Sequence, residues 1–133
     1  MDGPGDRYAD EAEWQDKAGY ARAARRGTRI AVSGTTSSGP DGRVLHPGDS
    51  FGQTAEAIAR ALRGGEALGG GVADVLRTRV YLAPGASWEE AARAHRESFG
   101  AVRPANTTVY VAGLVGEGLL VEVELDAELG SGS

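Results

Sequence analysis

Residues 103–126, RPANTTVYVAGLVGEGLLVEVELD, constrain the fold of this chain more than any other segment. Apolar and polar side chains alternate over residues 106–111 and again over residues 121–126. Because successive side chains of a strand point to opposite faces, this pattern predicts two β-strands joined by a glycine-containing turn, with Thr107 and Val109 toward a core. The polar face of the second strand carries three carboxylates, those of Glu122, Glu124 and Asp126.

Two interpretations of this acidic face are open from the sequence. A solvated face needs no further explanation, whereas a face covered by a partner subunit would partly bury the carboxylates and change their pKa. Arg77 and Arg79, on an earlier predicted strand, could pair with Glu122 and Glu124 within one chain or between chains.

Composition narrows the class of protein. A length of 133 residues fits one domain, and a net charge of -5 argues against binding to nucleic acid, which needs a basic surface.

The absence of cysteine excludes disulfides, thiol catalysis and cysteine metal sites, and fits a cytoplasmic protein. The two histidines, His46 and His95, lack metal-ligand spacing. No apolar run is long enough to span a membrane, and no apolar signal-peptide segment is found at the N-terminus.

The chain divides into three parts. Residues 1–17 are rich in glycine and acidic side chains, and we interpret them as a mobile arm. Residues 18–128 contain all the periodic segments and form the predicted domain. Residues 129–133 end in Gly-Ser-Gly-Ser and are interpreted as a flexible tail.

The predicted domain mixes strands with two helices. Residues 19–26 and 28–35 are typical of a hairpin that turns at Gly27, and residues 74–82 predict another strand. With the two strands in residues 103–126, the order is ββ-α-β-α-ββ. This order favours an α/β fold in which a mixed sheet carries both helices on one face.

Each helix has a predicted start and a predicted apolar stripe. The first follows a cap at Asp49 or Ser50 and runs to Leu68, with Ala55, Ile58, Ala59 and Leu62 on its stripe. Gly64-Gly65 predicts either a break in this helix or the close approach of another backbone. The second follows a cap at Ser87 and runs to Phe99. Its predicted stripe consists of Trp88, Ala91, Ala92, His95 and Phe99.

Six short motifs in this order resemble one known family. They are GYARA (residues 19–23), VSGTT (32–36), QT (53–54), DVLRTRVY (74–81), RPA (103–105) and VEVE (121–124). Together they are similar to the Rid family of YjgF-type reactive intermediate deaminases, also called L-PSP endoribonucleases. The resemblance covers residues 18–128.

The resemblance implies a chorismate-mutase-like fold and a homotrimer with small-molecule pockets in the clefts between subunits. Family deaminases hydrolyse reactive enamines and imines to 2-keto acids and ammonia without a cofactor, so no cofactor and no metal are expected here. The implied partners are a small molecule and two further copies of the chain, with neither nucleic acid nor membrane.

The sequence departs from the family pattern at the position that binds the substrate carboxylate. Deaminase members have arginine in the pattern Pro-x-Arg, where it grips a carboxylate with two hydrogen bonds. Here Asn106 stands at that position, and Ala92 and His95 replace a family asparagine and tyrosine. Asparagine is neutral and shorter, so recognition of a 2-imino acid is predicted to be lost.

Other pocket positions are retained. Glu122 is the predicted catalytic residue, as a carboxylate that moves a proton or orients water. Its alternative role is an ion pair with Arg77 or Arg79. The predicted substrate-binding residues are Asn106, Tyr20, Ser33, Gly34 and Tyr110. Asn106 could instead satisfy local polar groups, and His95 is expected to be a partly buried structural histidine.

Three functions follow from this combination. The first is an enzyme that hydrolyses or tautomerises a neutral or atypical imine, enamine or related carbonyl compound. The second is a non-catalytic trimer that binds or senses a metabolite. The third is a general 2-iminobutanoate/2-iminopropanoate deaminase that acts despite Asn106. A ribonuclease is disfavoured, because the basic cluster at residues 22–29 lacks aromatic side chains on which bases could stack.

Overall fold

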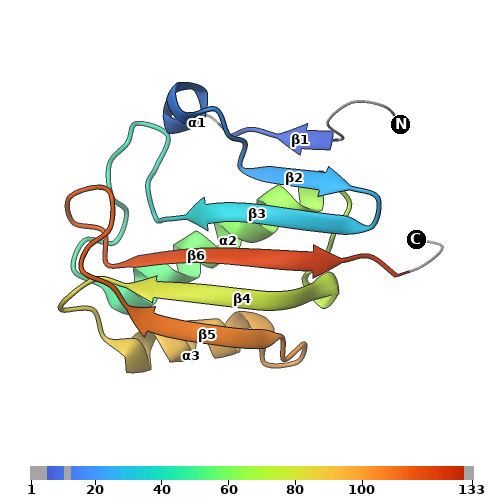
Figure 1. Cartoon of the computed structure of the whole chain (residues 1–133). Helices are drawn as coiled ribbons and strands as arrows, with labels where there is room; N and C mark the ends of the chain where they lie inside the picture. The colour runs from blue at the N-terminus through green and yellow to red at the C-terminus, as the bar shows by residue number, and fades with distance from the viewer. Residues whose placement is uncertain (1–5, 11–12, 131–133) are drawn as a thin grey trace.

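The computed structural model describes residues 6–10 and 13–130, and Figure 1 shows their arrangement. The elements in chain order are β1 (Asp6–Tyr8), α1 (Glu13–Ala18), β2 (Ala23–Arg26), β3 (Arg29–Thr35), α2 (Ser50–Ala67), the 3-10 turn η1 (Val72–Asp74), β4 (Val75–Leu82), α3 (Trp88–Phe99), β5 (Ala105–Tyr110) and β6 (Val121–Glu128).

One mixed sheet of six strands organises the fold, in the order β1-β2-β3-β6-β4-β5. β4 and β5 are parallel, and the other neighbouring pairs are antiparallel. α2 and α3 cover one face of the sheet, as predicted, and leave the other face open (Figure 1). The two strands predicted within residues 103–126 both form, but β4 lies between them. Their connection, residues 111–120, is longer than the tight turn that the sequence predicted.

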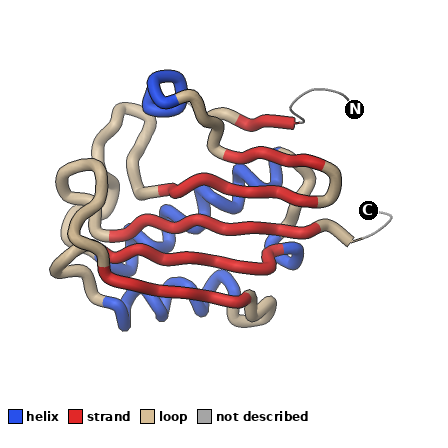
Figure 2. The backbone as a smooth tube through the Cα atoms, in the orientation of Figure 1, coloured by secondary structure: helices blue, strands red, loops and turns tan. Residues whose placement is uncertain are grey.

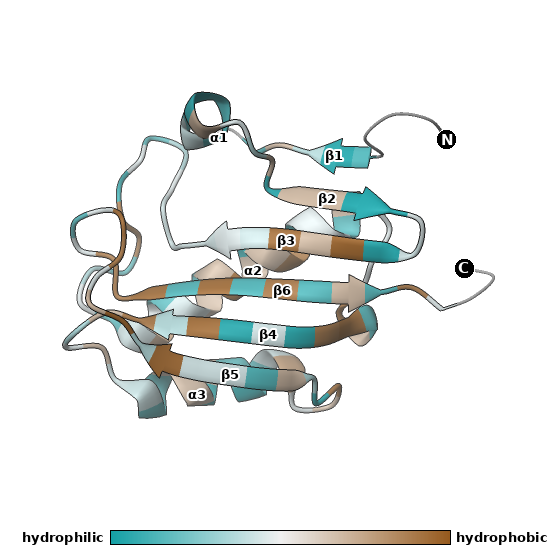
Figure 3. Cartoon of the chain, viewed as in Figure 1, coloured by the Kyte–Doolittle hydropathy of each residue, from teal (hydrophilic) through white to brown (hydrophobic). Residues whose placement is uncertain are grey.

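The hydrophobic core lies between the sheet and the two helices, with β6 at its centre. Val121, Val123, Leu125 and Ala127 alternate toward the helices and are buried, as the alternation predicted. Figure 3 shows the same alternation of hydrophobic and hydrophilic residues along β6. α2 adds Ala57, Ile58 and Ala61 to this core, and α3 adds Ala91 and Phe99.

The predicted helix stripes were only partly right. On α2 the buried stripe includes Gln53 and Thr54 rather than Ala55 and Ala59, because Gln53 bonds the backbone of the 111–120 loop and Thr54 bonds its own helix. On α3, Trp88 is 54% exposed instead of lying in the core.

The Gly64-Gly65 pair allows close packing and does not break α2. The helix continues to Ala67. A Cβ atom on Gly64 would lie 3.2 Å from Cγ of Arg22 and 3.4 Å from Cβ of Ala23. The predicted break is therefore wrong. Gly64 is approached closely by the side chains of Arg22 and Ala23, whereas the neighbouring backbone, the Gly70 carbonyl oxygen, would lie at an ordinary 3.5 Å from a Cβ on Gly65.

The described part of the predicted N-terminal arm is folded onto the domain. β1 pairs with β2 through Asp6↔Arg25, Arg7↔Ala24 and Tyr8↔Ala23. Asp10 then forms an ion pair with Arg60 of α2 at 2.7 Å and with Arg22 at 3.4 Å. The strand pairing and the buried charges explain why this segment differs from the predicted mobile arm. Residues 1–5 lie outside the described part.

The start of the predicted C-terminal tail also belongs to the domain. Leu129 is only 7% exposed, and its N–H donates to the Thr28 carbonyl at 2.8 Å. The tail residues 131–133 lie outside the described residues.

Replacing Asp10 should destabilise the domain. Asp10→Asn leaves two guanidinium groups without a carboxylate partner, which should lower the free energy of unfolding by about 3 to 5 kcal/mol. Urea denaturation measures this loss. The matched control is Asp41→Asn, whose exposed ion pair with Arg43 at 3.5 Å should contribute less than about 1 kcal/mol.

The same substitution should change the response to acid. Burial raises the pKa of Asp10, but hydrogen bonds from Arg60 and Gln15 and the charges of Arg22 and Arg60 outweigh burial and hold the pKa well below its usual 3.8. The stabilisation is thus complete above about pH 4 and is lost as the pH falls toward the lowered pKa. Unfolding free energy should fall less steeply with acid in Asp10→Asn than in the wild type, and equal slopes would contradict this role of Asp10.

Candidate active site

Glu122 lies on the open face of the sheet, near the start of β6. Its neighbours in the sheet are Tyr81 of β4 and the end of β3, where the pairing is interrupted by a bulge between Val32 and Thr35. A Cβ atom on Gly34, within this bulge, would lie 2.0 Å from Oε2 of Glu122. The carboxylate therefore lies directly across Gly34, in space that any other residue would fill.

The long loops of the chain gather at the same end of the sheet. Residues 36–49 and 111–120 both lie where β3 ends and β6 begins (Figure 2). The Gln53 side chain fixes the second loop, because it donates to the Gly118 carbonyl at 3.1 Å and accepts from the Leu120 N–H at 2.8 Å.

The Glu122 carboxylate is not neutralised by a neighbour. Within the described part of the chain, no side chain forms a hydrogen bond or ion pair with it. Burial raises the pKa of Glu122, Arg22 opposes that shift, and Glu124 adds to it. A half-buried carboxylate with a raised pKa is suited to accept and return a proton.

Glu124 and Asp126, on the same face, have ordinary ion-pair partners. Arg79 lies 3.9 Å from Glu124 and 3.3 Å from Asp126, and the Tyr81 hydroxyl donates to Glu124. This hydrogen bond and burial raise the pKa of Tyr81. The predicted pairing of Arg79 with Glu124 is therefore confirmed within one chain, and it leaves Glu122 unpaired.

Ser33 and Gly34 are held beside Glu122 by a buried arginine. Arg22 is 3% exposed, and its Nη1 donates to the Gly34 carbonyl at 2.7 Å and to Oγ1 of Thr35 at 2.9 Å. The Ser33 hydroxyl donates to the Ala21 carbonyl at 2.7 Å. Within the described residues, the Ser33 side chain therefore fixes the backbone beside Glu122.

Tyr20 lies two residues before Arg22 and is 41% exposed. Within the described residues its hydroxyl forms no hydrogen bond. The structure thus brings four of the predicted site residues to one end of the sheet: Tyr20, Ser33, Gly34 and Glu122.

Asn106 and Tyr110 lie elsewhere in the chain. They are on β5, two strands away from β6, and they face the helix side because Asn106 aligns with buried Thr78. Nδ2 of Asn106 donates to Oγ1 of Thr78 at 3.0 Å, and its Oδ1 accepts from Thr108 at 3.0 Å. The Tyr110 hydroxyl donates to the Ala86 carbonyl at 2.6 Å.

This register also reverses the predicted faces of β5. Thr107 and Val109 align with Arg79 and Tyr81 on the open face, so they do not face the core. Val109 is 41% exposed. The alternation was right, but the parallel pairing with β4 assigns its faces the other way round.

His95 completes a polar network under β5. Its Nε2 lies 2.8 Å from Oγ1 of Thr78, and its ring packs on Phe99 with a centroid distance of 4.7 Å. Burial lowers the pKa of His95, so the ring is neutral near pH 7. These contacts agree with the predicted structural role.

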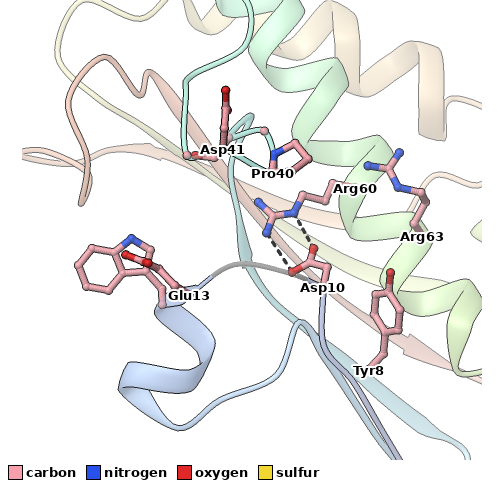
Figure 4. A pocket seen from close by; sticks show the side chains of 11 residues that line it. Tyr8, Asp10, Glu13, Pro40, Asp41, Arg60 and Arg63 are labelled. Atoms are coloured by element: carbon pink, nitrogen blue, oxygen red, sulfur yellow. Dashed lines mark hydrogen bonds and ion pairs between the residues drawn. The ribbon is translucent and has the colours of Figure 1, made fainter.

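A cavity of about 450 Å³ lies apart from Glu122, between the N-terminal segment, the 38–42 loop and α2 (Figure 4). Its lining includes Tyr8, Asp10, Pro40, Asp41, Arg60 and Arg63. Arg60 binds Asp10 in its wall, so that charge pair serves the fold. No predicted site residue lines it.

Among the described residues, no group of three or more histidine, aspartate or glutamate side chains could hold a metal ion. No helix in the described part of the chain is long and apolar enough to cross a membrane.

The sequence did not single out Asp10 and Arg22. Arg22 was grouped with surface arginines of the hairpin, because nothing local distinguishes it from Arg25, Arg26 and Arg29. The one available signal was its position directly after Tyr20-Ala21, within a motif that carried the family resemblance.

Comparisons with known proteins agree on the family and the fold. The family model described as endoribonuclease L-PSP matches residues 11–129. The Streptomyces coelicolor protein SCO2049 is 36% identical over 94% of this chain and 92% of its own length.

Solved structures are similar over almost the whole chain. Rv2704 of Mycobacterium tuberculosis, described as a member of the YjgF/YER057c/UK114 family, is 35% identical with a TM-score of 0.83. The alignment covers 93% of this chain and 98% of Rv2704. The Escherichia coli YjgF gene product shares the fold, with 22% identity, a TM-score of 0.77 and coverage of 96% and 98%.

A methyl group on Gly34 should displace the Glu122 carboxylate. Gly34→Ala should lower the pKa of Glu122 toward its usual 4.5, because the carboxylate moves from a half-buried position toward water. A ¹³C NMR titration of the glutamate carboxyl carbons measures this. Gly113→Ala, where a Cβ would meet nothing within 4 Å, is the control. An unchanged Glu122 midpoint in Gly34→Ala would contradict the described contact.

Proposed function

Because this chain belongs to the endoribonuclease L-PSP family of YjgF-type proteins, we propose that it is a cofactor-free enzyme for a small imine, enamine or related carbonyl compound. The observation that carries the proposal is the unpaired, half-buried carboxylate of Glu122 over Gly34. The proposed setting is the cytoplasm, as predicted from the cysteine-free sequence.

The proposed reaction is hydrolysis of a C=N bond. Glu122 takes a proton from water as the water oxygen bonds to the imine carbon, and the π electrons of the C=N bond move to nitrogen. The protonated carboxyl group then returns a proton to nitrogen. In the collapse of the carbinolamine, Glu122 takes the hydroxyl proton and passes it to nitrogen, the C=O bond forms as the C–N bond breaks, and ammonia and the carbonyl product are released. Tautomerisation of an enamine uses the same carboxylate to move one proton between carbon and nitrogen.

We propose a homotrimer with the site in the clefts between subunits. Within one chain, Asn106 and Tyr110 on β5 lie two strands away from Glu122 on β6. If the β5 edge of a neighbouring copy lay beside Glu122, the Asn106 and Tyr110 of that copy would complete the site, and this supports the proposed trimer. The exposed side chain of Val109 (41%), which aligns with Tyr81 on the open face, also favours a covered sheet face.

The proposed substrate is neutral. Asn106 carries no charge, and both polar atoms of its amide already bind threonine hydroxyls. A substrate carboxylate would therefore lack the charged partner that the family arginine provides. Cleavage of RNA, to which the family description refers, is not proposed, because a net charge of -5 disfavours a phosphate backbone.

Glu122→Gln tests the catalytic role. The amide has nearly the same shape but cannot accept the proton, so turnover should fall by about 100-fold or more. Ammonia release is measured from neutral imines that an amine oxidase generates in place from primary amines. The control is Glu128→Gln on the same strand, whose partners are Thr28 and Arg29. Unchanged turnover in Glu122→Gln contradicts the assignment, and ligand binding without turnover in the wild type favours a metabolite-binding trimer.

Asn106→Arg tests the substrate class. The wild type should not accelerate hydrolysis of 2-imino acids, which an amino-acid oxidase generates in place. Restoring the family arginine should give a measurable gain on these charged substrates, because the guanidinium can bind a carboxylate with two hydrogen bonds. Asn106→Lys, which adds a charge without the planar fork, is the matched variant. Clear acceleration by the wild type would instead support a general 2-imino-acid deaminase.

A further inference from the structure

We propose that Arg22 is a positioning residue for Glu122, and that Asp10 of the N-terminal segment holds Arg22 in place. Neither residue is expected to touch the substrate. The inference rests on the proposed role of Glu122 and extends the site to a segment that was predicted to be a mobile arm.

Arg22 fixes the backbone on which Glu122 lies. Its Nη1 donates to the Gly34 carbonyl at 2.7 Å, to Oγ1 of Thr35 at 2.9 Å and to the Ser33 carbonyl at 3.5 Å. These three consecutive residues form the bulged end of β3. Because the Glu122 carboxylate lies directly on Gly34, one guanidinium group determines the surface beneath it.

The Arg22 side chain is confined from the opposite side by α2. Its Cγ would lie 3.2 Å from a Cβ on Gly64, so the glycine leaves room for the arginine stem and for little else. Arg22 is 3% exposed. A buried, close-packed side chain has few alternative positions, which is the property that a positioning residue needs.

Asp10 makes this burial of positive charge possible. Arg22 and Arg60 are both largely buried, with side-chain exposures of 3% and 13%, and their like charges repel. Asp10 lies between them, at 3.4 Å from Arg22 and 2.7 Å from Arg60. A buried charge without a partner is strongly unfavourable, so the N-terminal segment becomes a structural part of the site.

Arg22 also sets the charge around Glu122. The groups that act on it are Arg22 before β2, Glu124 on its own strand and Tyr81 on β4. Of these, Arg22 alone favours the ionised carboxylate. Removal of the guanidinium should therefore raise the pKa of Glu122 further.

The test is a ¹³C NMR titration of Glu122 in the wild type and in Arg22→Gln, without any substrate. An upward shift of the Glu122 midpoint is expected in Arg22→Gln, and Arg22→Lys should lie closer to the wild type because the charge is kept. The control is Arg25→Gln, which also removes guanidinium bonds to backbone, at Gly27 and Leu68. Arg25→Gln should lower stability and leave the Glu122 midpoint unchanged.

A second measurement uses only the wild-type protein, so the test stands if Arg22→Gln does not fold. The Gly34 amide and the Arg22 guanidinium resonances should titrate with the same midpoint as the Glu122 carboxyl carbon. Resonances that do not follow Glu122, or an unshifted midpoint in folded Arg22→Gln, would overturn the proposal. The titrations contain no substrate, so their outcome does not depend on whether Glu122 is catalytic. Retained turnover in Glu122→Gln would reject the catalytic role of Glu122, and the titrations would still decide the role of Arg22.

Discussion

The ion pairs of Asp10 with Arg22 and Arg60 connect the parts of this structure on which the candidate site depends. One carboxylate joins the N-terminal segment, the start of β2 and the helix α2. Through Arg22 the same charge cluster reaches the bulged end of β3. Two buried guanidinium groups are tolerated at this position only because Asp10 stays ionised between them. The loss of that single negative charge would act on the fold and on the site together.

The acidic face of β6 shows how neighbours give similar residues different properties. Glu122, Glu124 and Asp126 occupy alternate positions on one strand and face the same side. Tyr81 donates a hydrogen bond to Glu124, and Arg79 forms an ion pair with Asp126. These contacts hold Glu124 and Asp126 on the surface of the sheet. Glu122 instead lies over a glycine, without a hydrogen bond or ion pair in the described part of the chain. Burial therefore has the largest effect on the pKa of Glu122 and raises it, which suits a group that accepts and returns a proton.

The sequence predicted the elements well and their long-range arrangement less well. Alternation identified the buried face of β6 correctly, because central strands are packed on that face by their neighbours. The same rule failed for β5, an edge strand whose faces depend on its parallel register with β4. The motifs brought Ser33, Gly34 and Glu122 together, but they could not show that Asn106 bonds Thr78 and Thr108. Arg22 was missed because its burial depends on Asp10, which lies outside the predicted domain.

Glu122 differs from the other carboxylates of β6 in that its burial favours the protonated form. The most direct measurement is its titration by ¹³C NMR in the unmodified protein. We expect a midpoint above the usual glutamate value of 4.5, because burial outweighs the opposing charge of Arg22. A midpoint at or below 4.5 would mean that the carboxylate is solvated or paired like its neighbours, and it would contradict the proposed role in proton transfer.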